Sequence, residues 1–446
     1  MRTLIRNGRA WLPDGPRNCS ILIDAGRIVD CVEPGKVVTA DNTIDAGGCD
    51  ILPGLVDLHV HLDDRIGDFE IADTYASGTE AAVCNGITTV CTFVTQPPGQ
   101  TMSQAVAEAL GKAGSNSHCD YSLHLTPTRF GRKDWQDIEH VLQDGYRTFK
   151  FYTTYRQAGL YLEYRELGLI LERVKAMGLG ALVHCEDDDM LERAGSEVAD
   201  PSDAYSHALS RPPDAEVEAI GRVLDIVNKT KCRTHFVHVS TAEGAKVIGR
   251  HRQDLAVSCE TGPQYLMFDD GLLKQIDGHR YLCSPPLRDT ATRQAMEDLA
   301  AQGQFDIYAT DHCPFTKADK DARREDFTKV PKGLPGVGAL VHVVHSINGK
   351  HGHDLDKLVE HLALRPAQIA GVYPRKGALQ KGADADIVII NANGEQRPVQ
   401  ASYSDVYDPY HGYTTHIDIK HVLLRGKAVV MDNALTDPNQ KQGRRV

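Results

Sequence analysis

Short apolar runs alternate with helical patterns through the middle of this 446-residue chain, and this alternation restricts its possible folds more than any other feature. The eight runs that resemble strands cover residues 56–61, 88–93, 122–125, 148–151, 181–184, 234–239, 256–258 and 307–309. Between most of them, apolar residues recur at helical spacing, most regularly in 163–177, 215–227 and 292–301. Eight strands alternating with helices predict an α/β fold, a (β/α)8 barrel of the TIM type.

The alternative to a barrel is a doubly wound open sheet. A dinucleotide-binding sheet has no support, because no Gly-x-Gly-x-x-Gly follows an early strand-like run. The two ends of the chain differ from the middle, since they contain short strand-like runs around turn residues such as Asp14, Gly15 and Pro16. We therefore expect a barrel domain over 55–371 and a small β-sandwich domain formed by both termini, 1–54 plus 372–446.

Composition argues against several classes of protein. A formal net charge of −12 and a pI near 5.9 argue against nucleic-acid binding, because phosphate neutralisation needs clustered lysine and arginine. The basic cluster at 441–445 is expected to be a solvated terminus. No apolar run reaches the length of a membrane span, so no membrane partner is expected. Eleven cysteines without a secretion signal or regular spacing predict reduced thiols and a cytoplasmic location.

A histidine pair stands in the first strand-like run, where His59 and His61 are two residues apart. Side chains two apart on a strand point to the same face, so both imidazoles would aim at one place. Such a pair is either half of a divalent-metal site or two hydrogen-bonded structural histidines.

Further ligand-type residues stand where later strand-like runs end, and they are His184, His238 and Asp311. Barrel active sites are built at the carboxyl ends of the strands. Each residue alone could be a core histidine or a helix cap, but their gathering at strand ends favours a metal site. Lys150 stands between two aromatic residues of the fourth run. A buried ammonium is costly there, so Lys150 needs a partner or a modification.

Several segments together resemble the cyclic amidohydrolases, the family that includes hydantoinases, dihydropyrimidinases, allantoinases and dihydroorotases. The matching segments are 52–61, 149–152, 182–186, 236–240, 281–288, 309–315, 376–379 and 382–388. The resemblance covers nearly the whole chain. It implies an enzyme that opens the ring of a small cyclic amide, such as a hydantoin or a dihydropyrimidine. The ring would be opened by a hydroxide that bridges two metal ions.

The resemblance also implies the metal ligands. They would be His59, His61 and Asp311 for one divalent ion, His184 and His238 for the other, and Lys150 for both. Carbon dioxide would carbamylate the lysine, and the new carboxylate would bridge the two ions in place of a buried ammonium. Zinc is the expected metal, although manganese and iron can share these ligands.

Residues for catalysis and substrate binding follow from the same resemblance. Asp311 would also carry the proton of the hydroxide to the departing ring nitrogen, and Tyr155 would donate a hydrogen bond to the oxyanion. Tyr155 and Ser284 favour a hydantoinase or dihydropyrimidinase, in which the backbone near this serine contacts the ring. Hydantoinases typically carry an asparagine where this chain has Lys332, so an anionic or carbonyl-rich substituent could reach Lys332, unless its side chain turns to solvent.

Other activities remain as alternatives. Dihydroorotases usually place an arginine just after the histidine pair, where this chain has Asp63 and Asp64, and allantoinases generally lack a tyrosine at the position of Tyr155. A metal-free structural relative is disfavoured because all six ligand positions are filled. A mononuclear deaminase is disfavoured because Lys150 is present. The resemblance further implies a homotetramer or a homodimer.

Overall fold

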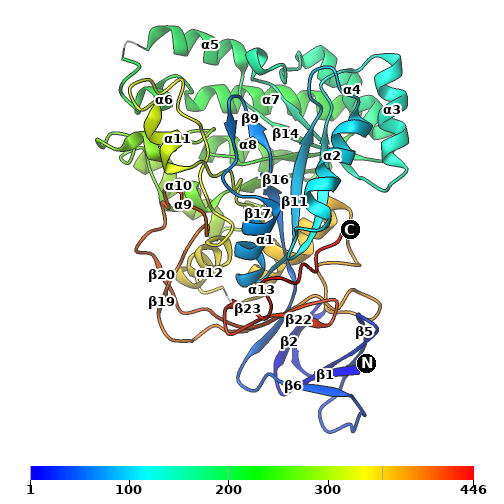
Figure 1. Ribbon diagram of the computed structural model, residues 1–446. Helices are drawn as coiled ribbons and strands as arrows, with labels where there is room; N and C mark the ends of the chain where they lie inside the picture. The colour runs from blue at the N-terminus through cyan, green and yellow to red at the C-terminus, as the bar shows by residue number, and fades with distance from the viewer. Residues whose placement is uncertain (1, 199, 354) are drawn as a thin grey trace.

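Eight parallel strands form the barrel in this computed structural model, which describes residues 2–198, 200–353 and 355–446 (Figure 1). In spatial order they are β8 (Leu55–Val60), β11 (Ile87–Thr95), β12 (Asp120–Thr126), β13 (Thr148–Tyr152), β14 (Gly180–His184), β15 (Arg233–Phe236), β16 (Val257–Thr261) and β17 (Ile307–Tyr308). The chain after β17 returns to β8, where the His61 backbone N–H donates to the His312 carbonyl at 2.8 Å. The predicted barrel is therefore confirmed, and each of the eight predicted runs contributes a strand.

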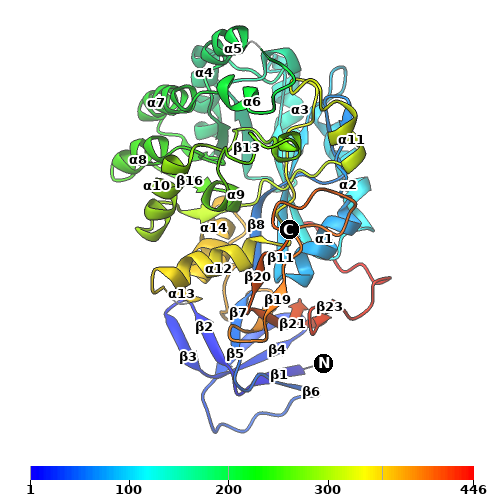
Figure 2. The same ribbon diagram turned by 90° about the vertical axis from the view of Figure 1, so that its left-hand side faces the viewer.

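Helices follow the barrel strands and cover the outside of the barrel (Figures 1 and 2). The α-helices are α1 (Tyr75–Cys84), α2 (Met102–Gly114), α3 (Arg132–Leu142), α4 (Tyr164–Ala176), α5 (Asp188–Glu197), α6 (Ser206–Leu209), α7 (Pro213–Thr230), α8 (Ala242–His251), α9 (Pro263–Met267), α10 (Thr290–Ala301), α11 (Lys317–Ala322), α12 (Leu340–Lys350), α13 (Leu355–Val359) and α14 (Arg365–Ala370). Short helical turns are η1 (Arg156–Ala158), η2 (Gly278–Tyr281) and η3 (Glu360–Leu364). The three most regular predicted helices correspond to α4, α7 and α10. In α4 the residues at helical spacing, Leu167, Ile170, Leu171 and Val174, are the buried ones.

Both termini build a second domain of two β-sheets, which lies below the barrel in Figure 1. One sheet has the order β5 (Arg27–Val32), β4 (Ser20–Asp24), β1 (Arg2–Arg6) and β6 (Asn42–Asp45). The other has the order β23 (Ala434–Leu435), β22 (Lys427–Met431), β21 (Asp418–Leu424), β18 (Ile387–Asn391), β7 (Asp50–Pro53), β2 (Arg9–Leu12) and β3 (Gly15–Asn18). Antiparallel pairing of β7 with β18 joins the two ends of the chain. The expected terminal β-domain is thus present, while its boundaries at 54 and 372 stay a prediction.

Two small hairpins lie outside these sheets. One pairs β9 (Arg65–Ile66) with β10 (Phe69–Glu70) in the loop after the first barrel strand. The other pairs β19 (Arg397–Pro398) with β20 (Thr414–Thr415). Between the strands of this second hairpin, Ser402 and Ser404 donate hydrogen bonds to the buried Asp73 carboxylate at 2.6 and 2.5 Å. The C-terminal region is therefore tied to the barrel as well as to the terminal domain.

The basic C-terminal cluster is attached to the barrel through its backbone, while Arg444 and Arg445 are exposed to solvent, as expected. The Arg444 carbonyl accepts a hydrogen bond from the Tyr121 backbone N–H at 3.0 Å, and the Arg444 N–H donates to the Asp120 carboxylate at 2.8 Å. Lys441 Nζ lies 2.6 Å from His118 Nε2. The backbone at the start of β12 and the buried carboxylate of Asp120 thus hold the backbone of this cluster.

Two expectations from composition can be compared with the structure. All eleven cysteines are free thiols. Within the described ranges, no helix combines the length and the apolar character that crossing a membrane requires.

Candidate metal centre

All six predicted ligands lie at the carboxyl ends of barrel strands. His59 is in β8, Lys150 in β13 and His184 in β14, whereas His61, His238 and Asp311 follow β8, β15 and β17. Four of the side chains are almost fully buried, with residue exposures of 1% for His59 and Lys150, 2% for His184 and 4% for His238. Because strand ends of a barrel converge on its mouth, these residues from five strands share one location.

His59, His61 and Asp311 form the first half of the site. Asp311 Oδ1 lies 3.0 Å from His59 Nε2 and 3.4 Å from His61 Nε2. One donor atom from each residue fits within 4.8 Å of the others, a spacing that suits a single cation. Burial opposes protonation of His61, but the carboxylates of Asp311 and Asp64 raise its pKa to about 9. Burial raises the pKa of Asp311, but His59, His61 and His238 outweigh it and hold this pKa well below its usual range.

His184 and His238 border this group. Their ring centroids are 4.4 Å apart, and the His238 ring is 5.4 Å from that of His59. His184 Nε2 bonds to a Glu186 carboxylate oxygen at 2.7 Å, which leaves Nδ1 to face a cation. His238 Nδ1 is buried and has no hydrogen-bond partner among the described residues. Burial lowers the pKa of His184 to about 4 and holds the pKa of His238 well below its usual range, which favours the neutral, metal-binding form of both.

Lys150 is buried beside aromatic rings instead of acids. Its Nζ lies 5.2 Å from the centroid of Phe93 and 5.0 Å from that of Tyr152. Across the part of the chain that the structure describes, no carboxylate lies within ion-pair distance of this nitrogen. Burial lowers the pKa of Lys150 to about 8, although Asp311 and Glu260 oppose the change. The lowered pKa increases the neutral fraction of this amine, and the neutral amine is the form that reacts with carbon dioxide.

Glu260 on β16 orients the ligands but was missing from the residues predicted from sequence. Its carboxylate lies 2.5 Å from His59 Nδ1 and 3.0 Å from His235 Nε2, and it accepts the His238 backbone N–H at 3.2 Å. A proton held on Nδ1 of His59 leaves Nε2 free to face Asp311 and a cation. The predicted run ended at residue 258, although β16 continues through Glu260. An acid so close to an apolar run was the available signal.

Asp57 forms hydrogen bonds both to His59 and to the segment just before Asp311. Its carboxylate accepts hydrogen bonds from the Thr310 hydroxyl at 2.6 Å and from the Thr310 backbone N–H at 3.2 Å. It also accepts the His59 backbone N–H at 3.2 Å. Burial raises the pKa of Asp57 to about 6, because it outweighs these hydrogen bonds. Asp57 thereby joins the first strand to the segment that presents Asp311.

Tyr155 lies on the His184 side of the site. Its ring centroid is 5.0 Å from that of His184, and its hydroxyl oxygen is 3.5 Å from an Arg211 guanidinium nitrogen. Arg211 Nε donates to the buried Glu186 carboxylate at 3.0 Å, so Glu186 connects Arg211 to His184. Burial raises the pKa of Tyr155 to about 12, although the Arg211 charge opposes this. The phenol is therefore a hydrogen-bond donor at neutral pH. Arg211 and Glu186 were not predicted as site residues.

Comparison with known proteins identifies the family of the chain. The model of the amidohydrolase family matches residues 51–429. The chain belongs to this family. The D-hydantoinases of Ralstonia pickettii and Geobacillus stearothermophilus are 31% and 32% identical to it over 439 and 445 residues. The alignments cover 96% and 97% of this chain and 95% and 93% of the relatives.

Solved structures of related proteins share the whole fold. The dihydropyrimidinase from Brevibacillus agri NCHU1002 has a TM-score of 0.93 at 30% identity, with 100% of this chain and 98% of that chain covered. The L-hydantoinase (dihydropyrimidinase) from Arthrobacter aurescens has a TM-score of 0.87 at 26% identity, with 99% and 98% covered. The resemblance to cyclic amidohydrolases that the motifs indicated is confirmed.

Ser284 and Lys332 of this amidohydrolase lie near Tyr155 and Arg211. Ser284 Oγ is 3.5 Å from His207 Nε2, and the Ser284 side chain lowers the pKa of Tyr155 against the effect of burial. Lys332 Nζ donates to the Thr328 carbonyl at 2.7 Å. Burial and the neighbouring Arg211 charge lower the pKa of Lys332 to about 8. Lys332 is thus held by its own loop, close to the cationic side of the site.

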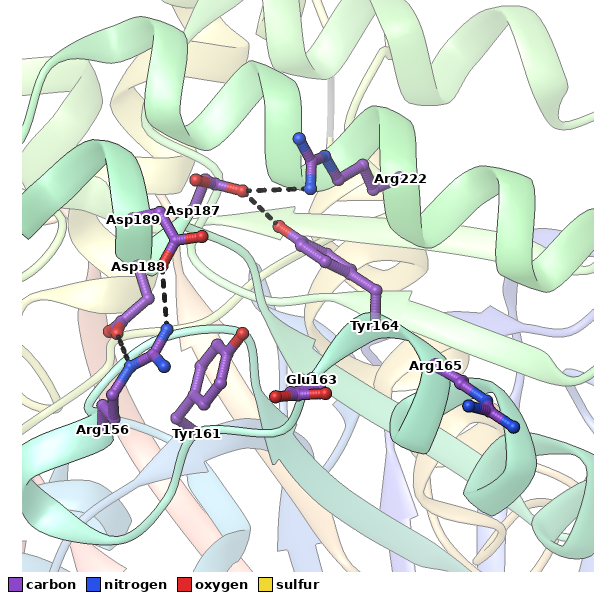
Figure 3. Close-up of a pocket in the computed structure, with 9 residues that line it drawn as sticks. All are labelled: Arg156, Tyr161, Glu163, Tyr164, Arg165, Asp187, Asp188, Asp189 and Arg222. Atoms are coloured by element: carbon purple, nitrogen blue, oxygen red, sulfur yellow. Dashed lines mark hydrogen bonds and ion pairs between the residues drawn. The ribbon is translucent and has the colours of Figure 1, made fainter.

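A polar cavity of about 300 Å³ lies beside the loops that follow β13 and β14 (Figure 3). Its lining includes Arg156, Tyr161 and Tyr164 from the first loop and the start of α4, and Asp187 and Asp188 from the second. Tyr164 donates to the Asp187 carboxylate at 2.9 Å. The cavity borders the segment that carries Tyr155. Hydrogen bonds between its lining residues connect the two loops.

Proposed function

We propose that this amidohydrolase opens the ring of a hydantoin or a dihydropyrimidine by hydrolysing a ring amide bond. The observation that carries the proposal is the gathering of six ligand-type side chains, with Tyr155 beside His184, at one end of the barrel. The names of the relatives, D-hydantoinase and dihydropyrimidinase, agree with it. Allantoin and dihydroorotate are the alternative substrates, and a metal-free structural protein is the alternative without catalysis.

The donor set suits two divalent cations. His59, His61 and Asp311 would hold one, and His184 and His238 the other, with Lys150 between them as a carbamate. Neutral imidazoles and carboxylates are common zinc ligands, so zinc is the expected metal. Carbamylation would turn a buried cation, with no carboxylate at ion-pair distance among the described residues, into an anion, which two cations stabilise. When bound, the two ions would lower the pKa of a water molecule and polarise the carbonyl of the ring.

The chain's own residues would guide the proton and the developing charge. As the water oxygen bonds to the ring carbonyl carbon, Asp311 would accept the proton of the water. As the ring C–N bond breaks, Asp311 would return that proton to the departing nitrogen. The product is a single open-chain molecule, which carries a carboxylate at one end and the released nitrogen, as an amide or a ureide, at the other. The Tyr155 phenol, which is protonated at neutral pH, would donate a hydrogen bond to the carbonyl oxygen as negative charge gathers there.

The charges at the mouth of the barrel affect which substrates the site can bind. An Asp64 carboxylate oxygen lies 3.9 Å from His61 Nδ1, so this side of the site is acidic where a dihydroorotate carboxylate would need a cation. On the other side, Lys332 and Arg211 are neighbouring cations. We propose that the ring contacts the backbone near Ser284, and that Lys332 faces an anionic or carbonyl-rich substituent. To do so, Lys332 would exchange its bond to the Thr328 carbonyl for one to the substrate.

The test is a substrate panel combined with elemental analysis of the purified enzyme. Hydantoin, dihydrouracil, allantoin and dihydroorotate would be compared by kcat/KM, with the metal content measured on the same sample. We expect two metal ions per chain and the highest kcat/KM for hydantoin or dihydrouracil. Full metal occupancy with a preference for allantoin or dihydroorotate would refute the substrate assignment, and absence of both metal and turnover would support the structural alternative. A cytoplasmic location and a homotetramer or homodimer stay predictions, the latter testable by light scattering.

A further inference from the structure

Tyr155 has a backbone conformation that is uncommon for a residue with a side chain. Its φ and ψ are 67° and 43°, in the left-handed region. A Cβ atom is crowded in that region, so an L-residue stays there only where surrounding contacts hold it. Some of these contacts lie within its own loop, since the Tyr155 carbonyl accepts the Ala158 and Leu160 N–H groups at 3.0 and 3.2 Å. These bonds fix the turn after Tyr155, but they do not place the turn relative to the metal ligands.

One carboxylate outside the loop bonds to the residues on both sides of Tyr155. Asp188 Oδ1 accepts the Thr154 hydroxyl at 2.9 Å, and Asp188 Oδ2 accepts Arg156 Nε at 2.8 Å. Figure 3 shows the Arg156 guanidinium reaching Asp188 and also its neighbour Asp189, which accepts a bond at 2.9 Å. The Asp188 side chain is only 14% exposed, whereas that of Asp189 is 66% exposed. Asp188 is therefore the more sheltered attachment point of the pair.

Asp188 is itself fixed relative to His184. It begins α5, four residues after the ligand, and Asp187 caps this helix by accepting the Met190 N–H at 3.1 Å. The intervening segment is bonded to the residue that follows β13, because the Thr153 hydroxyl donates to the Glu186 carbonyl at 2.9 Å. The Glu186 N–H lies 3.1 Å from the same hydroxyl oxygen, to which it donates. The segment that presents His184 thus also holds the turn that presents Tyr155.

We propose that Asp188 is a positioning residue, which holds the Tyr155 hydroxyl over the site by anchoring Thr154 and Arg156. The inference rests on the proposed role of Tyr155 as a hydrogen-bond donor to the substrate. Asp188 binds neither substrate nor metal in this arrangement. Its loss should therefore slow the chemical step while leaving the metal centre intact.

A double-mutant cycle tests this proposal on the metal-loaded enzyme. D188A removes both bonds, and Y155F removes the hydroxyl that they position. We expect D188A to lower kcat roughly 10- to 100-fold, because a misplaced catalytic group loses much of its effect. In the Y155F background, D188A should cause no further loss. The matched control is D189A, which removes only the exposed bond to Arg156 and should change kcat less than about twofold.

Two readouts besides activity complete the test. Metal content should be unchanged in all variants, and amide hydrogen exchange over 152–162 should increase in D188A but not in D189A. T154V, which removes one of the two bonds with little change in shape, should give a smaller kcat loss and replaces D188A if that variant does not fold. Equal D188A effects with and without the Tyr155 hydroxyl, or loss of metal, would overturn the proposal. Wild-type kcat in Y155F would instead refute the role of Tyr155 itself, and this result does not involve Asp188.

Discussion

Replacing Lys150 by methionine distinguishes two properties of this residue. One is the free-energy cost of burying its amine, and the other is its proposed role as a metal ligand. Methionine has a similar length and no charge, so packing between Phe93 and Tyr152 is largely kept. In the metal-free protein, burial lowers the pKa of Lys150 from 10.5 to about 8. This difference corresponds to about 3 kcal/mol against the folded state when the amine is protonated. We therefore expect metal-free K150M to be more stable than the metal-free wild type at pH 7 by up to about 3 kcal/mol.

The stability difference between metal-free K150M and the metal-free wild type should depend on pH. Below pH 8 the lysine is protonated in both the folded and the unfolded wild type, so the full cost is present. Between pH 8 and 10.5 the unfolded chain binds more protons than the folded one, so wild-type stability rises with pH. The advantage of K150M should accordingly shrink across this interval and disappear above it.

The measurement is urea unfolding of chelator-treated protein in buffer free of carbon dioxide, at pH 7 and pH 10.5. Metal content and kcat are measured in parallel on protein supplied with zinc and bicarbonate. K150M should then hold fewer metal ions than the wild type and lose activity, with partial rescue of K150A by a short carboxylic acid. Equal metal content in K150M and the wild type would refute the bridging role. Lower stability of metal-free K150M at pH 7 would refute the picture of an unpaired buried amine.

Three other substitutions address the neighbouring residues. E260A removes the acceptor that orients His59, so metal affinity should fall roughly 10- to 100-fold in a chelator competition; unchanged affinity would contradict the orienting role. K332A should lower kcat/KM for a carboxylated 5-substituted hydantoin more than for a neutral one, and an unchanged ratio would remove the proposed contact with an anionic substituent. R211M leaves Glu186 buried without its guanidinium, which should cost about 3–5 kcal/mol of stability at pH 7. Because Arg211 holds down the pKa of Glu186 against burial, the stability deficit of R211M should shrink as the solution is acidified and the unpaired carboxylate takes up a proton, and coincident urea-unfolding curves of the two proteins at pH 7 would contradict this account.

The barrel and the ligand histidines could be predicted because both depend on local patterns. Strand-like and helical spacings are short-range features, and the eight strands follow them. Strand ends of a parallel barrel meet at one mouth regardless of the conformation of the loops. His59, His184 and Asp311 could therefore be placed together without any knowledge of distances. The same reasoning gave the odd position of Lys150, which is buried with no carboxylate at ion-pair distance among the residues that the structure describes.

The residues that orient these ligands could not be predicted in the same way. Glu260 stands inside a strand whose apolar pattern breaks before it, because side chains near the barrel mouth pack against polar ligands instead of a hydrophobic core. Arg211 lies in a connecting segment, 25 residues beyond its partner Glu186, and no periodicity links the two. The hydrogen bonds between the Arg444 backbone and β12 are likewise long-range contacts, which charge composition alone could not reveal.

One hydrogen-bonded series connects the proposed ligand and the proposed oxyanion donor. Glu186 bonds His184 Nε2 on one side and Arg211 on the other, and Arg211 reaches the Tyr155 hydroxyl. Glu186 thereby decides which His184 nitrogen can face a cation, while its charge keeps Arg211 beside the phenol. A change in this carboxylate should disturb both the metal and the oxyanion side, whereas loss of Asp188 disturbs only the latter. The segment after β14 therefore makes two separate sets of contacts. Glu186 orients the proposed ligand His184, and Asp188 holds the loop after β13 that carries the proposed donor Tyr155.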